Sequence, residues 1–320
     1  MSIPLPDLAP LLRPWERAEA AVARFDQALR LSPVAGAYLS LARLHEAVRS
    51  AALDGLGTTP EAVLRVRLDP AAAGQDKASR AAVDIAEALE LAARRPLPEA
   101  LSPEGLAELA ERAERLSRGA EAPPDRGDLA WQAESWLEAA RLHGDWPGLL
   151  AAGAGLRELL LREAFGPACG RVARLALPLL LARAGKTAGP SLLLSERLSR
   201  RGGALEVLAR GGEAAFHLAM LEAFAGAAED GLRRLATLAL LRETLRRRCP
   251  GRRNTSSLGR AVDLVLAAPL LSARHLRDRL GLSLRGAHMV IDQLAAARVL
   301  VEATGRSRDR LFMAPEVLAW

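Results

Sequence analysis

Residues 162–181 read REAFGPACGRVARLALPLLL, and the interpretation of the whole chain depends on this stretch. A turn of small residues, Ala168-Cys169-Gly170, leads into Arg171, and Arg174 follows three residues later. The apolar run LALPLLL then has the character of a buried helix. The pattern has the outline of a catalytic loop, but it also fits the remains of such a loop or a plain turn between two core helices.

The sequence on both sides of this stretch repeats the pattern of amphipathic helices. Near the N-terminus, Trp15, Ala18, Val22, Phe25 and Leu29 recur at intervals of three and four residues and form one apolar helical face. Further helices are expected at 34–53, 77–95, 103–117, 127–143, 147–162, 171–184, 190–200 and 213–248. No segment of this part alternates apolar and polar residues as a strand does. We therefore expect a mainly α protein with an all-helical domain over residues 1–248.

Composition limits the class of protein. Hydrophobic residues make up 50% of the 320 residues, which suits a globular chain with a large core. Cys169 and Cys249, the two cysteines, have the spacing of neither a disulfide framework nor a zinc site. The sequence has no apolar run of membrane-spanning length, and its first residues lack the pattern of a signal peptide. We expect a cytoplasmic protein with no membrane partner.

The positive charge is concentrated near the C-terminus. Residues 246–320 contain 14 arginines and 6 acidic residues, a net charge of +8, whereas the whole chain carries +6. The other 245 residues are therefore slightly acidic. A local basic excess favours a polyanionic partner, although it also fits a solvated surface.

Residues 257–320 are predicted to form a small winged helix-turn-helix domain, joined by a basic linker at 249–256. Ser272 is a good N-cap for a helix, and Gly281 stands where that helix must end with a positive φ. Ser283 can cap the next helix, which runs to about residue 297. Two short segments, 299–303 and 310–313, then have the pattern of a β-hairpin wing.

Such a domain binds DNA by placing the N-terminal half of its last helix in the major groove, while the wing contacts phosphates or the minor groove. Basic residues in the linker add nonspecific attraction. The candidate DNA-contacting residues are Ser272, Ser283, Arg285, Gly286, His288, Arg306, Arg308, Arg310, Arg252 and Arg253. Winged helices also serve as protein-interaction modules, so a scaffold role, with a homodimer as one form of it, stays open.

The helical part resembles the Fic (Doc) family. The core motif of that family, H-P-F-x-D-G-N-G-R-x-G-R before an apolar helix, matches EAFGPACGRVAR at Phe165, Gly170, Arg171 and Arg174. The resemblance implies a Fic-like helical bundle. In active members it also implies transfer of AMP from ATP, with Mg²⁺, to a protein hydroxyl.

A second motif of the family has counterparts nearer the N-terminus. Ser50, Asp54 and Gly55 fall on the inhibitory pattern S-x-x-x-E-G, with Asp in place of Glu. The resemblance implies that Asp54 lies opposite Arg174. Through the segments GRRNTSSLGRAVDLVLAAPLLSARHLRDRLGLS and TGRSRDRLF, the chain also resembles, more closely, an uncharacterised bacterial family that pairs a domain of unknown function with a helix-turn-helix domain.

The departures from the core motif concern the groups that do chemistry. Glu163 stands in place of the histidine that acts as general base, and Pro167 in place of the acid that holds Mg²⁺. Ala168 and Cys169 replace the Gly-Asn of the phosphate-binding nest. We therefore expect a catalytically inactive domain with no cofactor.

Three interpretations of residues 162–181 remain. The stretch is a packing element with ion-paired arginines, an anion- or nucleotide-binding pocket without catalysis, or an AMP transferase site with Glu163 as base. Only the last two would involve ATP. The function predicted for the protein is DNA binding, in the role of a transcriptional regulator.

Overall fold

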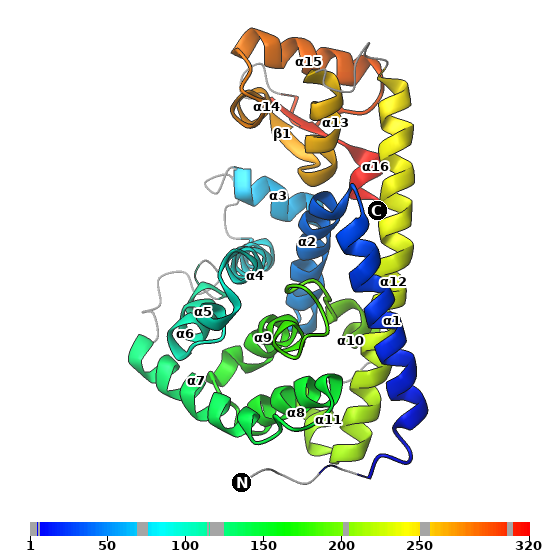
Figure 1. Ribbon diagram of the computed structural model, residues 1–320. Helices are drawn as coiled ribbons and strands as arrows, with labels where there is room; N and C mark the ends of the chain where they lie inside the picture. The colour runs from blue at the N-terminus through cyan, green and yellow to red at the C-terminus, as the bar shows by residue number, and fades with distance from the viewer. Residues whose placement is uncertain are drawn as a thin grey trace.

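The computed structural model describes residues 5, 7–68, 76–113, 115, 125–200, 205–249, 257–305 and 310–320 (Figure 1). Helices dominate, so the expected mainly α class is confirmed. The helical part consists of α1 (Leu12–Leu31), α2 (Ala35–Leu53), α3 (Pro60–Leu68), α4 (Lys77–Arg94), α5 (Leu97–Ala100), α6 (Pro103–Arg112), α7 (Arg126–Arg141), α8 (Gly148–Leu161), α9 (Cys169–Arg183), α10 (Ser195–Arg200), α11 (Leu205–Arg210) and α12 (Glu213–Arg248). Among the described helices, none combines the length and apolar character needed to cross a bilayer.

The long helices agree closely with the helices expected from periodicity, and α12 has the bounds that were predicted. The short helices α3, α5 and α11 were not predicted. Each has at most 9 residues, too few for a repeating apolar face to stand out.

Helix α12 runs along the full height of the molecule, with α1 beside it (Figure 1). Gly231 permits the close approach at this crossing. A Cβ at this position would lie 2.6 Å from the ring of Phe25 and 2.9 Å from the hydroxyl of Tyr38. The two helices can therefore pack at this depth only while position 231 has no side chain.

Helix α9 lies in the core of the helical part, where it contacts α4, α6 and α8. Nearly all of its residues from Val172 to Leu181 are buried, and Pro178 lies inside the helix. The indole of Trp136 on α7 donates a hydrogen bond to the carbonyl of Gly155 on α8, at 2.7 Å. Gly155 also faces Leu180, so α8 packs closely against the C-terminal half of α9.

The C-terminal module, residues 257–320, consists of α13 (Ser257–Ala267), β1 (Leu270–Ser272), α14 (Ala273–Leu280), α15 (Leu284–Ala296), β2 (Val301–Glu302), β3 (Leu311–Met313) and α16 (Pro315–Leu318). The strands form an antiparallel sheet in the order β1-β3-β2, with Leu271 opposite Phe312. Strand β1 was not predicted, because three residues ending in a helix cap give no strand pattern. The winged helix-turn-helix assignment stays a prediction.

The caps of this module agree with the sequence. Ser272 accepts a hydrogen bond from the amide of His275, and Ser283 accepts one from the amide of Gly286. Gly281 ends α14 with φ +68°, a conformation in which glycine avoids the steric cost of a Cβ.

The module is closely attached to the helical part. Asp263 on α13 pairs with Arg242 and Arg246 of α12 at 2.7 and 2.6 Å. Trp320 packs its ring against Tyr38, with centroids 5.5 Å apart, and donates to the carbonyl of Arg234 at 2.9 Å. The predicted domain limits at 248 and 257 stay predictions, and residues 250–256 of the expected linker lie outside the described part of the chain.

Candidate functional site

The motif turn joins α8 to α9 through an irregular backbone. Glu163, Phe165 and Gly166 have φ values of 50°, 68° and 52°, and a single 3-10 turn at Gly166–Ala168 follows. Positive φ is uncommon for residues with a side chain and costs free energy. The amide of Phe165 donates to the side-chain carbonyl of Gln132 at 2.5 Å, which helps to hold this turn.

The two motif arginines meet Asp54. Its Oδ1 accepts from Nη2 of Arg174 at 2.8 Å, and its Oδ2 accepts from Nε of Arg171 at 2.5 Å. Arg174 also donates from Nε to the hydroxyl of Ser50 at 2.6 Å and from Nη2 to the Ser50 carbonyl at 3.2 Å. The expected pairing of Asp54 with Arg174 is therefore confirmed.

The arginines of this cluster are more buried than Asp54, which lies at its exposed edge. The side chain of Arg174 is 7% exposed, that of Arg171 15% and that of Asp54 22%. Gly55, with φ +77°, directly follows Asp54 at the end of α2 and turns the chain away from the helix. One carboxylate thus accepts hydrogen bonds from two guanidinium groups. An anionic ligand would bind the two arginines through the same kind of charge-assisted hydrogen bond.

A second buried carboxylate lies near Arg174. Glu46 accepts hydrogen bonds from the amide of Ser195, at 3.0 Å, and from its hydroxyl, at 2.6 Å. Burial raises the pKa of Glu46, while the hydrogen bonds from Ser195 and the charge of Arg174 act in the opposite direction. The space between Glu46, Arg174 and the neighbouring leucines has no volume for a water molecule.

The remaining motif residues do not join this cluster. The side chain of Glu163 is 66% exposed and forms an ion pair with Arg210 of α11. Phe165 and Cys169 are buried in the core, and the Cys169 thiol lies 3.6 Å from the carbonyl of Leu159. Gly170 is half-buried in the first turn of α9. The described residues contain no group of three or more His, Cys, Asp or Glu side chains placed to hold a metal ion.

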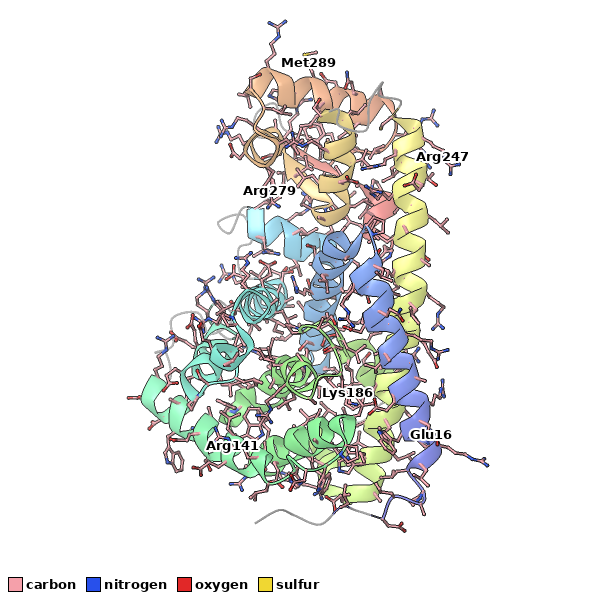
Figure 2. All side chains as sticks on the ribbon, viewed as in Figure 1. Glu16, Arg141, Lys186, Arg247, Arg279 and Met289 are labelled. Carbon is pink, nitrogen blue, oxygen red and sulfur yellow. The ribbon has the colours of Figure 1, made fainter. Side chains whose placement is uncertain are left out.

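Several of the residues predicted to contact DNA lie on α15 or cap α14 and α15. Arg285 and His288 are exposed on the N-terminal half of α15, which lies at the end of the molecule far from α5 to α11 (Figure 1). Figure 2 shows the side chain of Met289, on the same helix, pointing away from the protein. The hydroxyls of Ser272 and Ser283 serve as helix caps. Gly286 donates its amide to the second of these caps.

The segments predicted to form the wing contribute one described arginine. Arg310 pairs with Glu302 at 3.3 Å, and its guanidinium lies 5.4 Å from the ring centroid of Phe312. Arg306, Arg308, Arg252 and Arg253 lie outside the described residues. Charge at the wing is therefore partly neutralised at Arg310.

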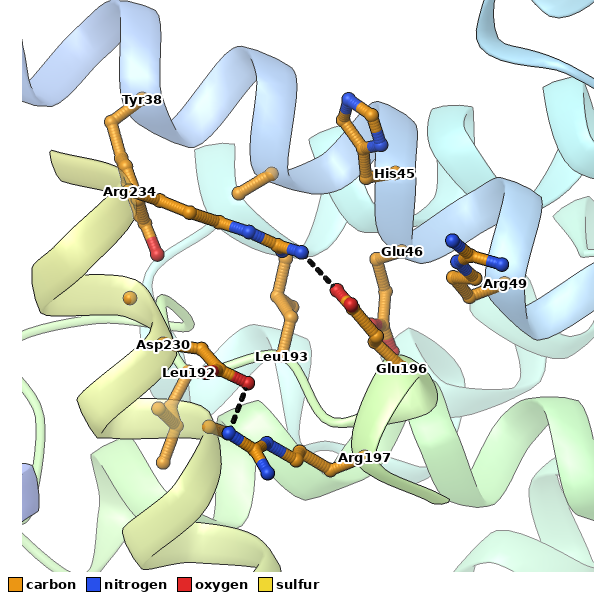
Figure 3. A pocket seen from close by; sticks show the side chains of 13 residues that line it. Tyr38, His45, Glu46, Arg49, Leu192, Leu193, Glu196, Arg197, Asp230 and Arg234 are labelled. Carbon is orange, nitrogen blue, oxygen red and sulfur yellow. Dashed lines mark hydrogen bonds and ion pairs between the residues drawn. The ribbon is translucent and has the colours of Figure 1, made fainter. Parts of the chain in front are cut away.

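A polar pocket between α2, α10 and α12 was not predicted from sequence (Figure 3). Its volume is about 40 Å³, and ion pairs cross it from Arg234 to Glu196 and from Arg197 to Asp230. The side chains of Glu196 and Arg197 are only 17% and 27% exposed, so neither is a fully solvated surface group. Burial, and then the charge of Arg234, lower the pKa of His45 in this pocket to about 4.

Three comparisons with known proteins bear on this geometry. Residues 12–94 match the family model described as Fic/DOC family N-terminal, a region that contains α1 to α4 and therefore Ser50 and Asp54. "Uncharacterized protein y4cF" of Sinorhizobium fredii is 30% identical over 206 residues, which are 62% of this chain and 52% of that protein. The chain thus spans about half the length of this curated relative.

The third comparison concerns the fold. A crystal structure of a Fic family protein from Desulfovibrio desulfuricans G20 has 17% sequence identity and superposes with a TM-score of 0.53, over 98% of both chains. At that identity the likeness shows a common fold. Residues 12–94 thus match the N-terminal region of the Fic/DOC family, and the chain shares the fold of a Fic family protein over almost its whole length.

Proposed function

We propose that the protein is a DNA-binding transcriptional regulator that contacts DNA through its C-terminal module, and that its Fic-like part does not transfer nucleotides. The observation that carries the proposal is the uncovered N-terminal half of α15, where Arg285 and His288 are exposed at the end of the molecule. This is the part of a reading helix that meets base edges. The net charge of +8 over residues 246–320 gives the attraction to phosphates that such contact needs.

The contacts of the motif residues support the second half of the proposal. Glu163, at the position of the general base, is directed to Arg210, and Pro167 has no side-chain donor for a metal ion. Arg171 and Arg174 already share the carboxylate of Asp54. Nucleotidyl transfer depends on positioned charge around the phosphates, and here the remaining charges are paired within the chain. A regulator of this kind acts on chromosomal DNA, so the proposal includes a cytoplasmic location.

Binding to labelled duplex DNA, measured by fluorescence anisotropy over a range of salt concentrations, tests the DNA half. We expect a steep loss of affinity with salt and weaker binding for Arg285→Gln, by about 1–3 kcal/mol if the residue reads a base. Arg306→Ala with Arg308→Ala tests the contribution expected of the wing and should reduce the salt dependence. Arg94→Gln, an exposed arginine on α4, is the matched control. Absence of binding to any DNA at low salt would refute this half.

A second candidate function is nucleotide binding without catalysis, and one observation favours it. Asp54 already places two carboxylate oxygens between Arg171 and Arg174, as an anionic ligand would place its own. Asp54→Ala should then allow ATP–Mg²⁺ to raise the melting temperature, whereas the wild type should respond less. No shift with ATP in either protein would leave the arginines with a purely structural role. Transfer of labelled AMP to any protein would point instead to an active enzyme with Glu163 as base.

A protein-interaction scaffold is the remaining alternative. Sedimentation velocity with and without duplex DNA separates it from the first proposal. A complex with DNA supports the regulator, while a homodimer that ignores DNA supports the scaffold.

A further inference from the structure

A cleft of about 690 Å³ lies at the end of α9 that is remote from the motif arginines. Residues of α5, of α8 and of the segment after α7 line it together with the last turn of α9. Twelve residues of α9 separate Arg171 from Arg183, a rise of about 18 Å along the helix. The cleft is within the usual size of small-molecule sites, roughly 300–1,000 Å³. It is therefore a separate cavity of ligand size.

The walls of this cleft are mostly apolar. Leu97, Leu101, Trp146, Ala151 and Leu180 supply much of the lining, and none of the described lining residues is acidic. Apolar walls left in contact with water are unfavourable, by about 25 cal/mol for each Å². An apolar ligand body that covered these side chains would therefore bind favourably.

Two exposed arginines, Arg141 and Arg183, lie at the same cleft without a partner among the described residues. Arg141 and Arg183 each occupy the last turn of their helix, α7 and α9, and Arg141 is labelled in Figure 2. Neither guanidinium has an ion-pair or hydrogen-bond partner among the residues that the structure describes. Burial, and then the positive charge of Arg141, lower the pKa of Arg183. A helix C-terminus explains each arginine singly, but it does not explain two like charges at one cleft whose described lining contains no carboxylate.

A buried histidine with unmet hydrogen-bonding capacity also lines the cleft. His143 is 3% exposed, and neither of its ring nitrogens has a hydrogen-bond partner among the described residues. The carboxylate of Glu158 lies 3.7 Å from Nε2, which is beyond a hydrogen bond. A neutral imidazole has one hydrogen-bond donor and one acceptor. Its burial is therefore unfavourable unless another group forms hydrogen bonds with these two nitrogens.

We infer that this cleft binds an amphipathic organic anion, a carboxylate with an aliphatic body. The carboxylate lies between Arg141 and Arg183, where it accepts charge-assisted hydrogen bonds from both guanidinium groups and offsets one of their two positive charges. The aliphatic body covers Leu101, Trp146 and Leu180. A small inorganic anion would leave the apolar walls in water, and a neutral apolar molecule would leave the two charges unpaired. The inference concerns a different cavity from the DNA-binding surface and stands independently of it.

Titration of the full chain with octanoate, 1-octanol and acetate, followed by calorimetry and by melting temperature, tests the charge requirement. We expect saturable binding of octanoate, with 1-octanol and acetate each at least about tenfold weaker. Arg141→Gln and Arg183→Gln should each weaken octanoate about tenfold. Arg94→Gln, which removes a last-turn arginine outside the cleft, should leave octanoate binding unchanged. Equal binding of octanoate by the wild type and both cleft variants, or no binding at all, would overturn the inference.

The shape requirement has its own variant. Ala151 is half-buried on the wall of the cleft, and Ala151→Phe should fill part of the volume. We expect octanoate binding to fall at least about tenfold, while circular dichroism shows unchanged helix content. Undiminished binding by a folded Ala151→Phe protein would place octanoate elsewhere and contradict the proposal. Should that variant fail to fold, the two arginine variants decide.

Discussion

Asp54 and Arg174 form an ion pair at 2.8 Å, although 120 residues separate them in the sequence. The contact joins the C-terminal end of α2 to the first turns of α9, and Arg171 adds a second guanidinium to the same carboxylate. A carboxylate at this point does two things at once. It pairs with two cations that are mostly removed from water and offsets one of their two charges, and it occupies the position in which an external anion would meet them.

The Asp54–Arg174 pair should contribute measurably to stability. Removing one partner of a buried pair leaves the other charge uncompensated, so we expect Asp54→Ala to lower the free energy of unfolding by about 2–4 kcal/mol. A double-mutant cycle with Arg174→Met should give a coupling of about 1–3 kcal/mol in urea unfolding. The exposed pair Arg17–Glu229 is the matched control, and its coupling should stay below about 1 kcal/mol. Equal couplings for the two pairs would contradict the prediction.

The crossing of α1 and α12 should not tolerate a side chain at Gly231. An alanine Cβ would lie 2.6 Å from Phe25 and 2.9 Å from Tyr38, so Gly231→Ala should cost about 1–3 kcal/mol despite the better helix propensity of alanine. Gly226→Ala on the same helix is the control, since its Cβ would meet the end of the flexible Arg197 side chain at 3.0 Å. Urea denaturation should show the smaller loss for Gly226→Ala. The reverse order would mean that the crossing can relax.

Protonation of a buried histidine should weaken the fold at acid pH. Burial, and then the charge of Arg157, lower the pKa of His217 to about 4 from 6.5. The unfolded chain therefore binds the proton first as the pH falls, so stability is lost between pH 6.5 and 4 and is independent of this group above 6.5. The shift corresponds to at most about 3 kcal/mol.

The matched pair for this prediction is His217→Gln and His288→Gln. His217→Gln should flatten the dependence of unfolding free energy on pH between 6.5 and 4, because glutamine does not titrate. His288→Gln, at an exposed position, should leave it unchanged. If both variants keep the wild-type slope, other groups cause the acid sensitivity.

The sequence predicted the features that depend on residues close together in the chain. The capping serines, Gly281 and the long helices follow from residues close together in the chain, and the structure has them. The Asp54–Arg174 pair was also predicted, because motif order assigned both positions. The partner of Glu163 was not, since Arg210 lies on α11, a helix of 6 residues without a readable period.

Features formed by segments that are far apart in the chain could not be predicted from the sequence. Strand β1 exists because Leu270, Leu271 and Ser272 pair with β3, about 40 residues away. The cleft beside Arg141 and Arg183 is lined by the last turns of two helices, α7 and α9. The sequence of neither helix indicates that the other lies beside it. Such sites depend on tertiary packing, which a one-dimensional pattern does not contain.

Ser283 and Arg285 should separate the structural role of α15 from its proposed contact with DNA. Ser283 caps the helix by accepting the amide of Gly286 at 3.1 Å, so Ser283→Ala should cost about 1 kcal/mol of stability. Arg285 is exposed, so Arg285→Gln should leave the melting temperature within about 1 °C and weaken DNA binding. If α15 reads DNA, thermal melts should show a loss of stability for Ser283→Ala alone, whereas Arg285→Gln should lose DNA affinity in anisotropy titrations with its stability intact. Loss of stability in Arg285→Gln, with DNA affinity intact, would show that this arginine serves the fold and that DNA does not contact it.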